Sequence, residues 1–146
     1  LRALELFDFD TIMFPFNWAL GVLHEWGDRL AQVAKEKDLG VIAIKSLAHR
    51  NWRDEETRKY PKSWCKPFDT DGEEATLALA SMKYAIEKGA MTQIPPGNIE
   101  HFRFMLDKIE HVLNAPLSNG ERQLLKDEAK KVEKELIFTP PSLTKS

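Results

Sequence analysis

The sequence predicts an α/β protein with a parallel sheet. Three short apolar runs alternate with longer segments in which apolar residues recur every three or four positions. Short apolar runs are typical of buried strands, and the longer pattern is typical of amphipathic helices. Strands that are joined through helices run parallel, and ligands then bind at the carboxyl ends of the strands. We therefore look for functional residues directly after Phe14, Ile44 and Ile94.

The first part of the chain predicts a helix end, a strand, a helix and a second strand. Residues 2–7 have the pattern of a last helical turn, and FDFDTIMFPF reads as a strand that Pro15 stops. Apolar residues at helical spacing predict a helix over 23–37. The run VIAI at 41–44 is of the buried parallel-strand type.

Residues 46–70 predict a long irregular loop, with no more than a short helix near 54–59. A loop of this length in a compact domain usually has a function or moves. With Trp52 and Trp64 it can fold over a substrate pocket, or it can equally form an oligomer contact.

The second part of the chain predicts three helices and one strand. A capping pattern at 71–74 starts the first helix, AMTQI is the third strand, and 99–113 is a helix whose wide apolar face must be covered on more than one side. A second capping pattern at 118–121 starts the last helix, and 139–146 is an extended tail. Three strands leave two unpaired edges, so we expect missing sequence or another chain to complete the sheet.

Composition narrows the function classes. The 146 residues suffice for one modest core, and 21 basic against 23 acidic residues give no charge that favours nucleic acid or an anionic membrane. No apolar run is long enough for a membrane span, and the four histidines have no metal-ligand spacing. Cys65 is the only cysteine, which favours a reducing cytoplasm. The chain begins like the last turn of a helix, so we expect a fragment.

The strand ends supply the candidate binding residues. Lys45 and Ser46 follow four apolar residues and either hold a phosphate or carboxylate, or simply reach solvent. Asn17 either donates to a ligand or serves the local turn. In the stretch Pro95 to Asn98, the prolines stiffen the exit from the strand, and the following helix offers free amides to an anion. Cys65 is interpreted as a packed thiol, and no acid-base pair emerges.

Four stretches occur together in a familiar order: FDFDTIMFPFNW, KDLGVIAIKSLA, KYAIEKGAMTQIPPGNIEHF and APLSNGERQLLKDEAKKV. Together they resemble the carboxyl-terminal half of an aldo/keto reductase of the bacterial type, over nearly the whole chain. The resemblance implies a parallel (β/α)8 TIM barrel, of which residues 1–138 would hold strands six to eight and their helices.

The same resemblance implies an NAD(P)H-dependent oxidoreductase that reduces aldehydes or ketones, with NADPH as the usual cofactor and NADH as an alternative. The cofactor-binding positions that it implies are Met13, Ile44, Lys45, Ser46, Pro96, Gly97 and Asn98. At several of these positions the chain departs from the family's usual cofactor contacts. The family's catalytic tetrad lies in the other half of the barrel, so no catalytic residue is assigned here. The alternative is a catalytically inactive module that binds or assembles through its exposed edges.

Overall fold

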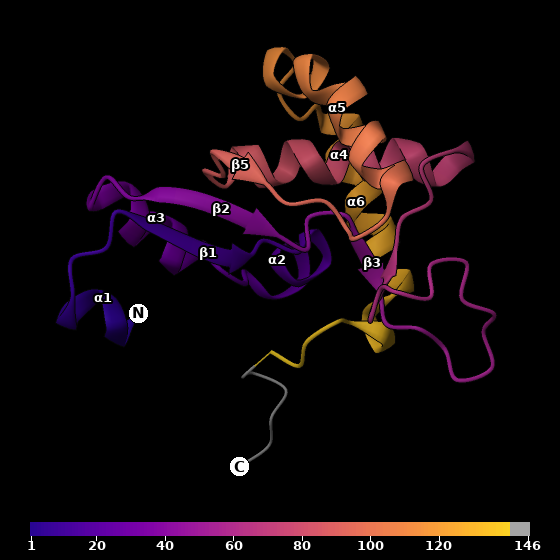
Figure 1. Cartoon of the computed structure of the whole chain (residues 1–146), viewed down its shortest axis with the longest axis horizontal. Coiled ribbons are helices and arrows are strands. Elements are labelled where there is room, and N and C mark those ends of the chain that lie inside the picture. Colours follow the sequence, from indigo (N-terminus) through magenta and orange to yellow (C-terminus); the bar gives the residue numbers. More distant parts are fainter. Residues whose placement is uncertain (141–146) are drawn as a thin grey trace.

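The computed structural model describes residues 1–140, so the tail expected over 139–146 lies almost wholly outside the described residues. Figure 1 shows the elements in chain order. They are α1 (Arg2–Leu6), β1 (Thr11–Pro15), α2 (Trp18–His24), α3 (Asp28–Glu36), β2 (Gly40–Ile44), β3 (Ala48–Arg50), β4 (Lys66–Pro67), α4 (Gly72–Glu87), β5 (Thr92–Gln93), α5 (Ile99–Asn114), α6 (Asn119–Lys131) and the 3₁₀ helix η1 (Glu133–Glu135).

The main sheet has three parallel strands in the order β1-β2-β5. β1 and β2 pair from Thr11 opposite Gly40 to Pro15 opposite Ile44, whereas β5 pairs with β2 only through its two residues. β3 and β4 form a separate antiparallel pair. The parallel arrangement agrees with the sequence, but the expected TIM-barrel half is wrong. Within residues 1–140, no strand pairs with the outer edges of β1 and β5, and the sheet stays open.

Helices cover one face of this sheet. Val41 and Ala43 of β2 are buried on that face, against Ala34 of α3 and Ala85 of α4. The side chains of a strand alternate between the two faces of a sheet, and those on the other face are largely uncovered. Met13, which pairs with Ile42, is 57% exposed on it.

The helix expected over 23–37 is two helices. α2 begins earlier, at Trp18, and ends at Glu25, which has the left-handed conformation with φ of 53°. Gly27 also has a positive φ, 88°, and a Cβ there would lie 2.7 Å from the Phe14 ring. Only glycine combines this backbone with so close an approach. The apolar spacing runs through the break, which is why the pattern indicated a single helix.

α5 and α6 lie beyond the carboxyl ends of the strands, whereas α4 runs back alongside the sheet (Figure 1), and the three helices share a core with α2. The capping pattern at 118–121 is confirmed, since Ser118 and Glu121 form a complete capping box. α5 buries Phe104, Met105 and Val112. Its opposite side is exposed, and with β5 it lines an apolar groove of about 300 Å³. Within the described chain, α5 is therefore not covered on more than one side.

The segment 51–65 is an irregular loop between β3 and β4, without the short helix considered near 54–59. In Figure 1 it extends away from the helices. Arg50 binds Glu56 with two hydrogen bonds of 2.7 and 2.8 Å. Asn51 donates from its backbone to the Glu135 carbonyl and from its side chain to the Leu136 carbonyl, each at 2.7 Å. The loop is thus tied down at its first residues by the C-terminal segment.

Candidate functional site

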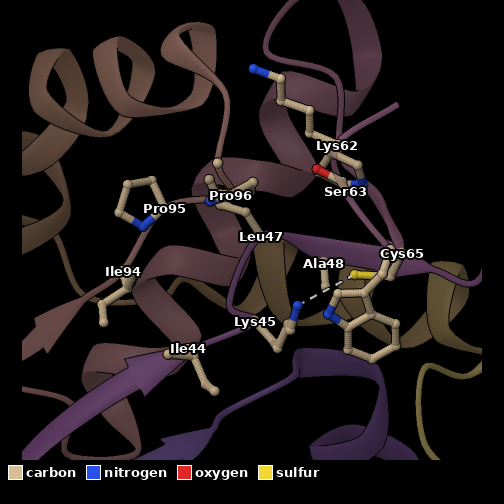
Figure 2. Close-up of a pocket in the computed structure, with 13 residues that line it drawn as sticks. Ile44, Lys45, Leu47, Ala48, Lys62, Ser63, Cys65, Ile94, Pro95 and Pro96 are labelled. Atoms are coloured by element: carbon tan, nitrogen blue, oxygen red, sulfur yellow. Dashed lines mark hydrogen bonds between the residues drawn. The ribbon is translucent and has the colours of Figure 1, made fainter. Parts of the chain in front are cut away.

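A cavity of about 250 Å³ lies where β2 and β5 end. Its walls come from the ends of the two strands, the last residues of the 51–65 loop and the turn that leads to α5 (Figure 2). The lining residues are Ile44, Lys45, Leu47, Ala48, Lys62, Ser63, Trp64, Cys65, Pro67, Ile94, Pro95, Pro96 and Gly97. Ligands of parallel sheets bind at this edge, so the cavity is the candidate site.

The lining carries positive charge without any carboxylate. Lys45 and Lys62 contribute two ammonium groups, and no Asp or Glu lines the cavity. Neither lysine forms a salt bridge within the described part of the chain. Lys62 is an exposed residue of the rim, and Figure 2 shows its side chain extending away from Lys45. The half-buried Lys45 is therefore the cation that most needs a partner.

The position of Lys45 is fixed by the backbone around it. Its φ of 63° is left-handed, which is uncommon for a residue other than glycine, and it ends β2 with a sharp turn. Its carbonyl accepts a hydrogen bond from the buried Asn17 amide at 3.4 Å, and Asn17 also donates to the Ala48 carbonyl at 2.8 Å. The Asn17 oxygen in turn accepts from the Leu20 amide at the start of α2. Asn17 thus serves the fold and not a ligand.

The Lys45 ammonium contacts two uncharged groups. It lies 4.2 Å from the centre of the Trp64 ring and 3.9 Å from the Cys65 sulfur, the contact drawn as a dashed line in Figure 2. Burial raises the pKa of the Cys65 thiol, although the neighbouring Lys45 charge acts in the opposite direction. The thiol is therefore neutral at physiological pH, and Lys45 keeps its charge available to an anion.

Two hydrogen bonds hold the loop side of the cavity in place. The Ser63 carbonyl accepts from the Trp52 indole at 2.7 Å, and the Ser63 hydroxyl accepts from the Asn98 side chain at 3.0 Å. Asn98 occupies the N-cap position of α5, as the sequence indicated, but its side chain does not cap the helix. It instead joins the turn before α5 to the loop, so the two walls of the cavity are linked.

The structure brings together four of the seven expected binding residues. Ile44, Lys45, Pro96 and Gly97 all line the cavity, and Asn98 is hydrogen-bonded to the lining residue Ser63. Ser46 is fully buried outside the lining, and its hydroxyl has no partner among the described residues. Met13 is in the middle of β1 on the bare face of the sheet, away from the cavity.

Sequence reasoning named the loop but not all of its lining residues. Trp64 was expected in a loop that either folds over a pocket or forms an oligomer contact, and it lines the cavity; Lys62 and Ser63 also line it and were not singled out. Their place depends on the pairing of β3 with β4, which returns the chain to the strand ends. The signal available in the sequence was a tryptophan close to a lysine and a serine within a long loop.

Two other kinds of site receive no support within residues 1–140. No group of three or more His, Cys, Asp or Glu side chains there is arranged to hold a metal ion. No helix in the same range has the length and apolar character required to cross a membrane.

No protein-family model, curated protein or solved structure matches this chain. The resemblance to aldo/keto reductases therefore stays a prediction, and the function has to be argued from the cavity itself.

Proposed function

We propose that this chain is part of an NAD(P)H-dependent oxidoreductase that reduces aldehydes or ketones, and that it contributes the cofactor-binding strand ends. One observation carries the proposal. The Lys45 ammonium stands without a carboxylate partner in a cavity whose lining has no acidic residue. Such a cavity favours an anion, and the phosphates of a nicotinamide dinucleotide are anions that bind at the ends of parallel strands.

The chemistry of the reaction divides between the cofactor and the protein. The bound cofactor supplies hydride, and the residues of this chain hold and orient it. Lys45 neutralises phosphate charge, while Ile44 and Ile94 offer apolar surface at the strand ends. No residue of this chain is assigned the proton transfer to the carbonyl oxygen. The single unpaired thiol, Cys65, fits a reducing cytoplasm, which we propose as its compartment.

A titration with NADPH and with NADH, followed by tryptophan fluorescence, tests the binding half of the proposal. We expect quenching, with NADPH as the tighter ligand. Lys45→Met removes the half-buried charge and is expected to weaken binding about tenfold or more. Lys126→Met removes an exposed lysine of α6 and serves as the charge-matched control. Absence of quenching by either nucleotide in the unmodified chain would overturn the proposal.

A second candidate function, an assembly module, is favoured by the open edges of the sheet. Outside their pairing with β2, β1 and β5 present unpaired backbone among the described residues, and α5 adds exposed apolar side chains beside β5. We propose a second copy as the occupant, because the outer edge of β1 in one copy can pair with the outer edge of β5 in another. Light scattering after size exclusion tests this. Leu106→Lys on the exposed side of α5 should dissociate the assembly, and a monomeric unmodified chain would exclude it.

A further inference from the structure

The cavity is small for the ligand that the proposed function requires. Its volume of about 250 Å³ lies below the roughly 300–1,000 Å³ of pockets that enclose drug-sized molecules. A dinucleotide is larger still, so only one end of it fits inside. A single ring with one phosphate matches the space.

Trp64 provides a surface for such a ring. It lines the cavity, yet 53% of the residue is exposed. The centre of its ring lies 5.7 Å from the centre of the Phe138 ring. The carbonyl and the hydroxyl of the adjacent Ser63 both accept hydrogen bonds, from Trp52 and Asn98. The indole therefore stands on an anchored segment while much of it stays accessible to a planar ligand, and bases stack well on such a platform.

Lys45 lies over this platform. Its ammonium lies over the Trp64 ring at 4.2 Å, with the neutral Cys65 thiol as its other contact. A phosphate is a stronger partner for an ammonium than either group. Moving the ammonium onto a phosphate frees the indole face, so the same side-chain movement prepares both halves of the site.

We infer that this cavity binds a phosphorylated ring of mononucleotide size, with Trp64 stacking on the ring and Lys45 pairing with the phosphate. The inference rests on the proposed function and specifies it, since the ring and phosphate would be one end of the dinucleotide. The remainder of the dinucleotide then lies outside the cavity. Recognition by ring and charge together requires both residues, whereas a simple anion site requires only the lysine.

The experiment compares parts of the ligand by isothermal titration calorimetry on the full chain. The probes are nicotinamide mononucleotide, adenosine 2′-monophosphate, ribose 5-phosphate and NADPH. Trp64→Leu is expected to weaken binding of the three probes that carry an aromatic base about tenfold. The affinity for ribose 5-phosphate, which has no base, should stay within about twofold. Lys45→Met is expected to weaken all four. Trp64→Phe should restore part of the stacking, and Lys126→Met should change nothing.

The single thiol gives a second readout. Cys65 lines the cavity, so a bound mononucleotide should slow its reaction with a maleimide in the unmodified chain, and adenosine without phosphate should not. Unchanged affinity of the ring-bearing phosphates in Trp64→Leu, while NADPH still binds, would overturn this inference and leave the proposed function standing. Mononucleotide binding without NADPH binding would overturn the proposed function and leave this inference standing. Failure of every probe to bind would refute both.

Discussion

At the scale of single residues, two side chains at the cavity lack the partners that such residues usually have. Lys45 has a ring and a thiol beside it where a carboxylate is usual, and Asn98 joins two walls where a helix cap was expected. Lys45 is thereby available to a ligand, whereas Asn98 joins the walls of the cavity and does not cap α5. Functional sites are where such departures from local rules are expected.

Gly97 allows the cavity to be tested without disturbing the fold. A Cβ at this position meets no atom within 4 Å, and its backbone does not have the left-handed φ that favours glycine. Gly97→Val should therefore leave the melting temperature nearly unchanged. Because the added methyl groups enter the cavity, we expect nucleotide binding to weaken roughly tenfold in a calorimetric titration. Unaltered affinity would show that the turn has only a structural role.

At the scale of elements, the close contact between α2 and α4 fixes the helices behind the strand ends. Gly21 faces the buried Tyr84, and a Cβ there would lie 2.0 Å from the tyrosine oxygen and 2.8 Å from the ring carbon that bears it. Asn17 caps α2 while it holds the Lys45 carbonyl, so the same helix connects the core to the site.

Gly21→Ala should destabilise the protein even though alanine favours helices. The overlap with Tyr84 is expected to lower the free energy of unfolding by about 1–3 kcal/mol, measured by urea denaturation. Gly120→Ala in α6 is the matched control, because its Cβ has no neighbour closer than 4.0 Å. That change should be neutral or stabilise by up to about 1 kcal/mol. Equal effects of the two substitutions would contradict the close packing of α2 against α4.

At the scale of the whole molecule, buried histidines connect distant parts of the chain. His49 of β3 lies 2.9 Å from Glu128 of α6 and stacks on Phe68, and His101 of α5 contacts the Phe68 carbonyl at 2.8 Å. Burial lowers the pKa of His49, against the opposing effect of its hydrogen bond to the Glu128 carboxylate. Burial likewise lowers the pKa of His101, against its bond to the carbonyl.

Stability should therefore fall when the solution is acidified below about pH 6.5. Because both histidines have a lower pKa in the folded state, the unfolded chain binds more protons there, and acid favours unfolding. The contribution of the histidines is fully present above pH 6.5. Urea denaturation at pH 7.5 and 5.5 measures it, and His49→Gln should reduce the difference. Equal free energies of unfolding at both pH values would contradict the lowered pKa values.

A second loss of stability should follow in stronger acid. The hydrogen bonds from Arg50 lower the pKa of Glu56 to about 2, below its ordinary value of 4.5. This group contributes stability above pH 4.5 that disappears as the pH falls towards 2.

The sequence predicted the elements whose signals are local. Four consecutive apolar residues identified β2, and a serine three positions before a glutamate identified the start of α6. The expected binding residues came together where a strand end placed them, as with Lys45 and Gly97. Local patterns thus located these elements, although the helix expected over 23–37 is divided and Asn98 does not cap α5.

The features that the sequence did not predict depend on distant partners. The break at Glu25 and Gly27 follows from the approach of the Phe14 ring, which periodicity does not contain. Closure of the sheet depends on which edges find partners, so the expected barrel was wrong although the three parallel strands were predicted. Trp64 reached the cavity through the pairing of β3 with β4, a contact that no local pattern encodes.

The attachment of the loop to the C-terminal segment also affects the order in which parts of the chain can fold. Asn51 is held by the carbonyls of Glu135 and Leu136, and its side-chain bond spans 85 positions of the chain. A ribosome releases residue 51 before residue 136, so the start of the loop lacks this anchor until the C-terminal segment has emerged. The strands and α4 can form first. The start of the loop then reaches its final arrangement only after Glu135 and Leu136 are in place.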